Sequence, residues 1–160
     1  MPTMTHLDEE GRVRMVDVSE KSATVREAVA HGVITMLPET FDLISEQKAK
    51  KGNVLETARI AGIMAAKKTA ELIPMCHPLS ISFVQIDFFP NPDTHSIRIE
   101  AVVRVVSQTG VEMEALTAVS IAALTIYDMC KSYDRAMTIS DVYLIKKSGG
   151  KSGTFERPSS

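Results

Sequence analysis

Charged side chains of this chain gather at a few positions that flank an apolar stretch. The segment at residues 109–131, TGVEMEALTAVSIAALTIYDMCK, begins with Glu112 and Glu114. It ends with Asp128 and Lys131, and its middle carries no charge. A helix this apolar is usually buried, so its charged ends should lie where the core meets solvent. The sequence therefore predicts chemistry at the two ends of one buried helix.

The two ends of this helix are too far apart to form one site within one chain. Asp128 lies 14 residues after Glu114. At a rise of about 1.5 Å per residue in a helix, the two residues are roughly 21 Å apart. One small molecule cannot comfortably react at both ends. Either the chain has two sites, or a neighbouring subunit brings opposite ends together.

The candidate side chains suit acid–base chemistry on an anionic ligand. Glu112 and Glu114 are acceptors for the N–H edge of a guanine-like or pterin-like ring. His77, in the rigid connection IPMCHPL, could move protons together with Asp128 and Lys131. Lysines at predicted element ends could line a pocket for an anionic ligand: Lys51, Lys67, Lys131, Lys147 and Lys151. From the residues alone, the ligand is a heterocycle that carries phosphate.

Each of these features also has a structural interpretation. His77 could be a structural histidine, and the two glutamates could merely favour the helix dipole. Asp128 and Lys131 could be a surface ion pair. The run KKSGGKSG could be a flexible basic tail rather than an anion-binding turn. Cys76 beside His77 suggests a thiolate nucleophile, but no second histidine pattern supports that role.

Composition limits the class of protein. The chain has 160 residues, 44% of them hydrophobic, which predicts one globular domain over residues 1–160, with flexible ends at residues 1–14 and 155–160. A net charge of −2 and 5% aromatic residues argue against nucleic-acid binding. Two cysteines are too few for a disulfide scaffold, and neither a secretory signal nor a run long enough to span a membrane is found. We therefore expect a cytoplasmic protein.

Periodicity predicts the elements that position these side chains. Residues 25–36 alternate like a strand, although a helix is not excluded, and Pro38 suits the start of a helix. Asn53 and Glu56 predict a helix with a capping box that runs until Pro74. Further strands are predicted at residues 81–89, 96–107 and 137–147, with the turn PNPD between the first two.

The order of these elements predicts the fold. In the segment at residues 96–107, one face carries only apolar side chains: Ile97, Ile99, Ala101, Val103 and Val105. With the long helix before the last strand, the order is β-α-β-β-α-β. This order predicts an α+β, ferredoxin-like fold, in which two helices pack on one face of an antiparallel sheet.

Four stretches extend this interpretation beyond general chemistry. They are MVDVS at residues 15–19, KGNVLETARIAGIMAAKKTAELIPMCHPL at residues 51–79, the helix segment at residues 109–131, and KSGGKSG at residues 147–153. Together they closely resemble the family of cyclic pyranopterin monophosphate synthases, the molybdenum cofactor biosynthesis protein C family. The resemblance spans nearly the whole chain, from about His6 to Phe155. Met75 stands where many members have leucine.

The resemblance implies a specific reaction and assembly. Members are phosphorus–oxygen lyases that convert 3′,8-cyclo-7,8-dihydro-GTP to cyclic pyranopterin monophosphate and release diphosphate. They are ferredoxin-like and assemble as a homohexamer, a trimer of dimers, with sites at subunit interfaces. No redox cofactor or protein-bound metal is implied, although magnesium could accompany the triphosphate. No nucleic-acid or membrane partner is implied either.

The resemblance also assigns roles to residues. Catalytic roles fall on Asp128, Lys51, Lys131 and His77. Substrate contacts fall on Met75, Cys76, His77, Glu112, Met113 and Glu114, with phosphate contacts at Lys67 and Lys147. A lysine crowded by other cations should have a lowered pKa and act as a base. The competing hypothesis is a non-catalytic nucleotide-binding regulatory module, which needs the basic pocket but not Asp128.

Overall fold

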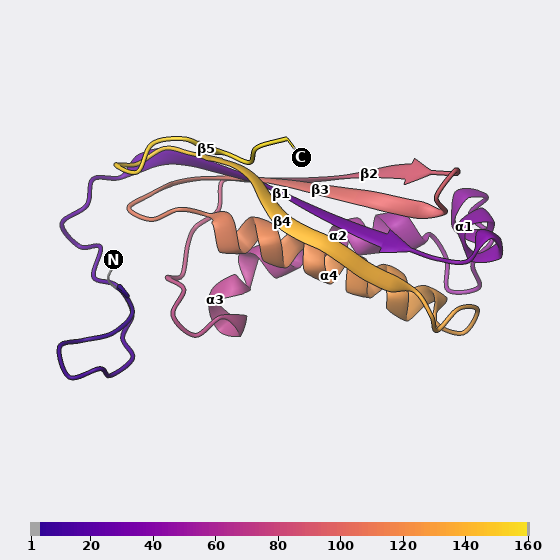
Figure 1. The fold of residues 1–160 in the computed structure, drawn as a ribbon, viewed down its shortest axis with the longest axis horizontal. Coiled ribbons are helices and arrows are strands. Elements are labelled where there is room, and N and C mark those ends of the chain that lie inside the picture. The colour runs from indigo at the N-terminus through magenta and orange to yellow at the C-terminus, as the bar shows by residue number, and fades with distance from the viewer. Residues whose placement is uncertain (1–3, 160) are drawn as a thin grey trace.

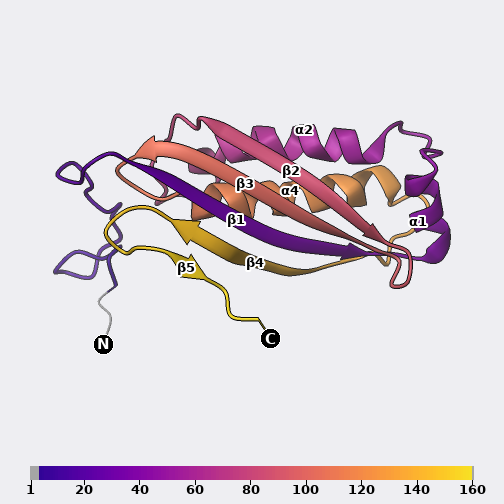
Figure 2. The ribbon, with the colours of Figure 1, turned by 90° about the horizontal axis from the view of Figure 1, so that it is seen from above.

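A five-stranded antiparallel sheet forms one layer of the computed structural model, which describes residues 4–159, and the helices lie on one side of it (Figure 1). The strands are β1 (Thr24–Thr35), β2 (Phe83–Asn91), β3 (Ser96–Ser107), β4 (Thr138–Ser148) and β5 (Phe155–Glu156). Figure 2 shows their order in the sheet, β2-β3-β1-β4-β5. The predicted α+β, ferredoxin-like fold is confirmed.

The uncertain first segment is a strand, β1, and it lies at the centre of the sheet. It pairs antiparallel with β3 on one side and β4 on the other. Its small residues face the helices: Ala28 and Ala30 are fully buried. A methyl group on Gly32 would already lie 3.6 Å from the Cβ of Val119. The small side chains therefore let the long helix approach the sheet closely.

The other strands lie close to their predicted positions. β3 has the predicted bounds, and its predicted apolar face is buried in the core. β2 is displaced towards the C-terminus, so the turn occupies residues 92–95 rather than PNPD at residues 90–93. β4 begins and ends one residue later than predicted.

The helices are α1 (Pro38–Ser45), α2 (Val54–Lys67), α3 (Thr69–Leu72) and α4 (Glu112–Cys130). Asn53 caps α2, because its side-chain oxygen accepts a hydrogen bond from the Glu56 amide at 3.1 Å. The second contact of the predicted capping box is not made, since the Glu56 carboxylate pairs with Arg59 at 3.1 Å. The cap is therefore one-sided.

The prediction of one helix from residue 54 to Pro74 is wrong, because the helix is interrupted at Lys68. The Thr69 hydroxyl is buried and donates to the carbonyl oxygens of Ala65 and Ala66, both at 3.1 Å. These bonds occupy the acceptors of the last turn of α2. The chain then continues as the single turn α3 before it reaches IPMCHPL.

α4 is the central helix of the core and packs against α2 and the sheet. Its alanines Ala115, Ala118 and Ala122 are fully buried. A methyl group on Gly62 of α2 would lie 2.9 Å from the Ala118 carbonyl oxygen, so the two helices are in close contact. By length and composition, α4 is the one helix of the described residues that could cross a membrane, contrary to our prediction that no segment could. Here half of its apolar window is buried inside the fold.

The chain ends also contain some structure. β5 pairs with β4 through Lys146 and Lys147, and the Arg157 amide donates to the Ile145 carbonyl oxygen at 2.8 Å. We predicted flexible ends at residues 1–14 and 155–160. Of these, residues 1–3 and 160 lie outside the described residues. The flexibility of the ends stays a prediction, as does the count of one domain.

Candidate active site

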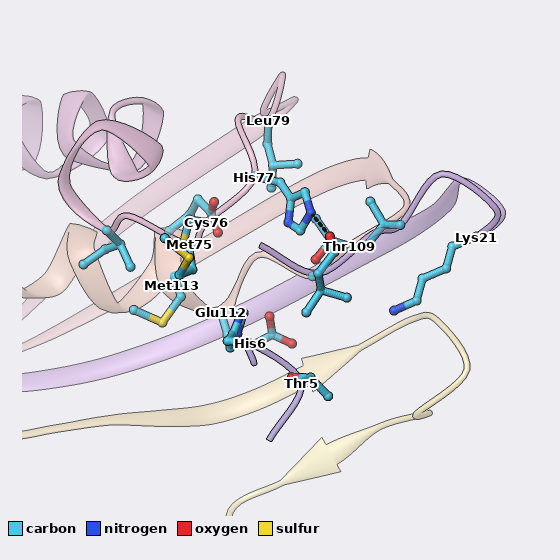
Figure 3. A pocket seen from close by; sticks show the side chains of 15 residues that line it. Thr5, His6, Lys21, Met75, Cys76, His77, Leu79, Thr109, Glu112 and Met113 are labelled. Atoms are coloured by element: carbon cyan, nitrogen blue, oxygen red, sulfur yellow. Dashed lines mark hydrogen bonds between the residues drawn. The ribbon is translucent and has the colours of Figure 1, made fainter. Parts of the chain in front are cut away.

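The predicted site residues fall into two groups at opposite ends of α4, as the helix length requires. A cavity of about 390 Å³, which we call the main pocket, lies at the start of α4 (Figure 3). It is lined by the turn after α3, the start of α4 and the N-terminal segment: Thr5, His6, Val16, Val18, Lys21, Ile73, Met75, Cys76, His77, Leu79, Thr109, Gly110, Glu112, Met113 and Glu114. Its volume lies within the range of small-molecule sites.

Glu112 and Glu114 are two residues apart but have different surroundings. Glu114 is only 4% exposed, whereas the Glu112 side chain is about a third exposed. Burial raises the pKa of Glu114 to about 7, and the Glu112 carboxylate adds to that rise. The Lys147 ammonium lies 4.0 Å from Glu112. At neutral pH Glu114 can therefore be protonated, while Glu112 beside it faces the Lys147 ammonium.

The connection IPMCHPL contributes Met75, Cys76 and His77 to the lining of the main pocket. The His77 ring nitrogen Nε2 lies 2.6 Å from the backbone carbonyl oxygen of Val16. Burial raises the pKa of the Cys76 thiol, and the charge of Glu114 adds to the effect. A raised pKa disfavours the thiolate, which argues against Cys76 as a nucleophile.

Lys67 lies beside the main pocket rather than in it. It lines a smaller hollow of about 110 Å³ that shares Leu79 and Glu114 with the main pocket. It occupies the last turn of α2, which ends near the start of α4 (Figure 1). The position is compatible with the predicted contact to an anionic ligand near Glu114.

The catalytic candidates Lys51, Asp128 and Lys131, which we call the lysine cluster, lie at the other end of α4. The Lys131 ammonium is 2.9 Å from the Asp128 carboxylate, and the Lys51 ammonium donates to the Asp128 backbone carbonyl oxygen at 3.1 Å. The side chains of Asp128 and Lys131 are more than half exposed. Within one chain, the lysine cluster and the main pocket are therefore separate, and His77 belongs with the pocket.

Charge pairing fixes the ionisation of the lysine cluster. The hydrogen bond from Lys131 lowers the pKa of Asp128, and the charges of Lys131 and Lys51 lower it further. The same hydrogen bond raises the pKa of Lys131. The expected lowering of a lysine pKa by crowded cations is therefore wrong for Lys131, because its nearest charge is a carboxylate. At neutral pH both groups are charged.

Residues that sequence reasoning missed hold the lysine cluster in place. The Lys50 amide donates to the Tyr133 hydroxyl at 2.9 Å, which ties the loop before α2 to the loop after α4. Asp134 is buried and accepts a hydrogen bond from the Leu37 amide at 2.9 Å, so it caps α1 from a distant part of the chain. No local pattern could have revealed these partners, because they lie more than 80 residues apart.

A hollow lined by basic residues, which we call the basic hollow, adjoins the main pocket, and of its residues only Lys151 was predicted. Its volume is about 260 Å³, and it is lined by Lys21, Ser22, Thr24, Arg26, Gly150, Lys151 and Ser152. Lys21 lines both cavities. Gly149 and Gly150 adopt φ values of +95° and +78°, so the KSGG turn needs glycine there. The available signal for the missed residues was the motif MVDVS, which precedes Lys21 and Arg26, but we assigned no site residue at residues 15–26.

The described residues contain no cluster of three or more histidine, cysteine, aspartate or glutamate side chains that could hold a metal ion. Whether magnesium accompanies a substrate stays a prediction.

Comparison with known proteins identifies the family of this chain, and the matched region contains the motifs of the sequence analysis. Residues 15–150 match the MoaC family. The chain belongs to the MoaC family. This match includes MVDVS, IPMCHPL, all of α4 and the KSGG turn at residues 147–150. It therefore includes every candidate site residue of the sequence analysis except Lys151, which lies just beyond it.

The curated relatives cover almost the whole chain. A protein of Desulfatibacillum aliphaticivorans is 65% identical over 97% of this chain and 98% of its own length. Proteins of Desulforapulum autotrophicum and Pelotomaculum thermopropionicum are 63% and 60% identical, over 97% and 98% of this chain and 95% and 92% of their own lengths. All three are named cyclic pyranopterin monophosphate synthase.

Proposed function

We propose that the protein is a cyclic pyranopterin monophosphate synthase of molybdenum cofactor biosynthesis. It converts 3′,8-cyclo-7,8-dihydro-GTP to cyclic pyranopterin monophosphate and releases diphosphate. The observation that carries the proposal is the pairing of two carboxyl groups in the main pocket, Glu112 and the buried Glu114, with the basic hollow next to it. A ring with N–H donors and a chain of phosphates needs these two environments side by side.

The substrate contacts follow from the chemistry of the pocket. Glu112, which lies beside the Lys147 ammonium, accepts hydrogen bonds from the ring, and Glu114 can donate or accept because burial raises its pKa to about 7. Lys147 begins the KSGG turn, and its ammonium lies 4.0 Å from Glu112, where it can contact phosphate. Lys21 and Arg26 extend the cationic surface along the phosphates.

The reaction requires proton transfers that the lysine cluster can perform. When the cyclic phosphate forms, a substrate hydroxyl attacks the α-phosphorus, the bond to the departing diphosphate breaks, and the hydroxyl proton must go to a base. Asp128 is the ionised group available for this step. Lys131 and Lys51 can neutralise the charge that develops on the leaving diphosphate. These roles remain part of the proposal.

The separation of the main pocket from the lysine cluster supports a site shared between subunits. A residue at the start of α4 lies roughly 21 Å from Asp128 along the helix axis. A two-fold dimer can bring the end of one α4 next to the start of the other. We therefore propose a homohexamer, a trimer of dimers, in which the lysine cluster of one subunit completes the main pocket of its neighbour. We also propose a cytoplasmic location, which the two free thiols of Cys76 and Cys130 support.

A subunit-mixing experiment tests both the activity and the shared site. Purified protein incubated with 3′,8-cyclo-7,8-dihydro-GTP should release diphosphate, and Glu114→Ala and Asp128→Ala should each be inactive. After subunit exchange, the mixture as a whole should regain about a quarter of wild-type activity, because half of the dimers are mixed and one of the two sites in each is intact.

The matched control mixes Glu114→Ala with Glu112→Ala, which change the same end of the helix. This mixture should regain no activity, since every mixed site then carries one altered residue. A wild-type protein that releases no diphosphate would contradict the activity. Equal recovery in both mixtures, or none in demonstrably mixed oligomers, would contradict the shared site.

A further inference from the structure

The N-terminal segment, residues 4–19, forms one wall of the main pocket although it contributes no strand to the sheet. Within it, residues 6–14 form a hairpin. The Arg14 amide donates to the His6 carbonyl oxygen at 2.8 Å, and Leu7 and Val13 form an isolated antiparallel bridge. Thr5 and His6 enter the pocket from this segment, on the side of the labelled residues away from Leu79 (Figure 3).

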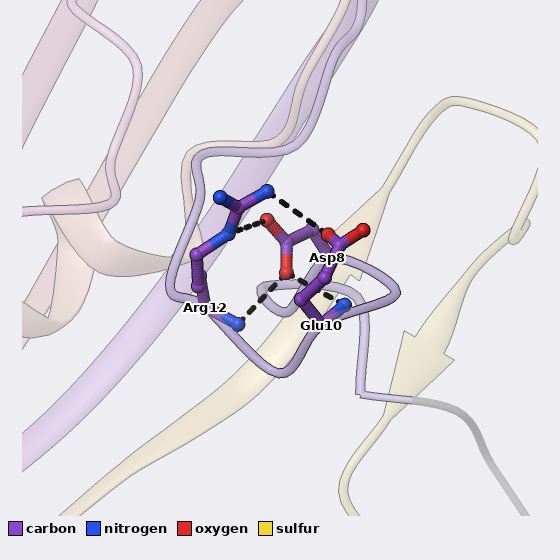
Figure 4. A network of polar contacts seen from close by, with 3 residues as sticks. All are labelled: Asp8, Glu10 and Arg12. Atoms are coloured by element: carbon purple, nitrogen blue, oxygen red, sulfur yellow. Dashed lines mark hydrogen bonds and ion pairs between the residues drawn. The ribbon is translucent and has the colours of Figure 1, made fainter.

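The tip of this hairpin is held together by its own side chains. Figure 4 shows the Asp8 carboxylate accepting hydrogen bonds from the amides of Glu10 and Arg12, at 3.0 and 2.8 Å. The Arg12 guanidinium pairs with Asp8 at 2.7 Å and with Glu10 at 2.9 Å. Gly11 has a φ of +77°, which suits the turn. The hairpin can therefore keep its shape while it moves relative to the sheet.

Apart from the local turn, in which the Lys21 amide donates to the Val18 carbonyl oxygen at 3.0 Å, one hydrogen bond joins this segment to the remainder of the described residues. It runs from His77 Nε2 to the Val16 carbonyl oxygen at 2.6 Å. Because a carbonyl oxygen only accepts, Nε2 carries the proton. The ion pairs of the segment are internal, and Met4, Val13 and Met15 are exposed, so little apolar burial holds it down. Segments with so few contacts open at low free-energy cost.

We propose that residues 5–18 are a strap that opens to admit the substrate and closes over it. His77 is the positioning residue that latches the strap, and His6 is a residue that contacts the substrate heterocycle when the strap is closed. The imidazole of His6 offers one donor and one acceptor nitrogen to a ring that carries both kinds of group. The inference rests on the proposed function for the identity of the ligand, but not for the existence of the latch.

Limited proteolysis tests the latch without any turnover. Trypsin should cleave faster after Arg12 and Arg14 when the strap leaves the wall of the pocket. Cleavage after the exposed Lys48, which lines neither the main pocket nor the basic hollow, serves as the internal reference. His77→Ala should increase the cleavage rate after Arg12 and Arg14 by about fivefold, which corresponds to one ordinary hydrogen bond. His77→Gln should restore the wild-type rate, because its amide nitrogen can donate to Val16. Equal rates in all three proteins would overturn the latch.

Ligand dependence and kinetics test the contact with the substrate. In Asp128→Asn, 3′,8-cyclo-7,8-dihydro-GTP whose binding is confirmed by calorimetry should slow cleavage after Arg12 and Arg14, and an unchanged rate would overturn closure. His6→Ala should raise KM at least fivefold without a change in melting temperature, whereas Glu9→Ala in the same hairpin should leave KM unchanged. Equal KM values for the two variants would overturn the role of His6. A wild-type protein that binds and converts no substrate would instead refute the proposed function.

Discussion

Glu114→Gln should change how the stability of the protein depends on pH. In the fold, burial raises the pKa of Glu114 from 4.5 to about 7. The folded protein therefore keeps a proton that the unfolded chain loses, and its free energy of unfolding falls as pH rises through this interval. The interval of about 2.5 pH units, at about 1.36 kcal/mol per unit, gives a loss of about 3 kcal/mol. Glutamine cannot ionise, so the variant should not lose this stability.

Urea unfolding at pH 5, 6, 7 and 8, at one protein concentration, measures the effect. The free energy of unfolding of the variant should rise relative to that of the wild type as pH rises. At pH 8 the variant should be more stable by up to about 3 kcal/mol. Glu112→Gln removes a carboxylate from the same helix start at a partly exposed position, so it controls for the helix dipole.

Parallel stability curves for the wild type and Glu114→Gln would refute this reasoning. They would show that Glu114 is ionised in the folded protein throughout the range. A cation, rather than burial, would then determine its charge, and the role of Glu114 as a proton donor at neutral pH would fall with it.

Three further changes test the packing and the site. Gly62→Ala should destabilise the protein by about 1–3 kcal/mol in urea unfolding, because its methyl group would lie 2.9 Å from the Ala118 carbonyl oxygen; no loss would show that α2 moves freely. Asn53→Ala should cost about 1 kcal/mol through loss of the cap on α2, and a cost near zero would contradict that cap. Asp128→Asn should abolish diphosphate release while the melting temperature stays unchanged, since the side chain is exposed; wild-type turnover would contradict its catalytic role.

The sequence by itself predicted the elements whose signals are local. The apolar face of β3 follows from alternation, because a strand turns every second side chain to the core. The start of α2 follows from Asn53, whose side chain bonds an amide only three residues away. The apolar middle of α4 predicted both its burial and the separation of its charged ends. The resemblance to a family added roles for residues that periodicity cannot assign.

The tertiary structure decided what depends on partners distant in the chain. Glu112 and Glu114 have the same side chain, yet only Glu114 is buried, because the turn of the helix directs one inwards and the other to the mouth of the pocket. Lys21 became a site residue because the start of β1 lies next to the KSGG turn. His77 binds Val16, which is 61 residues away. Such contacts are set by how the layers pack, and no short sequence window contains both partners.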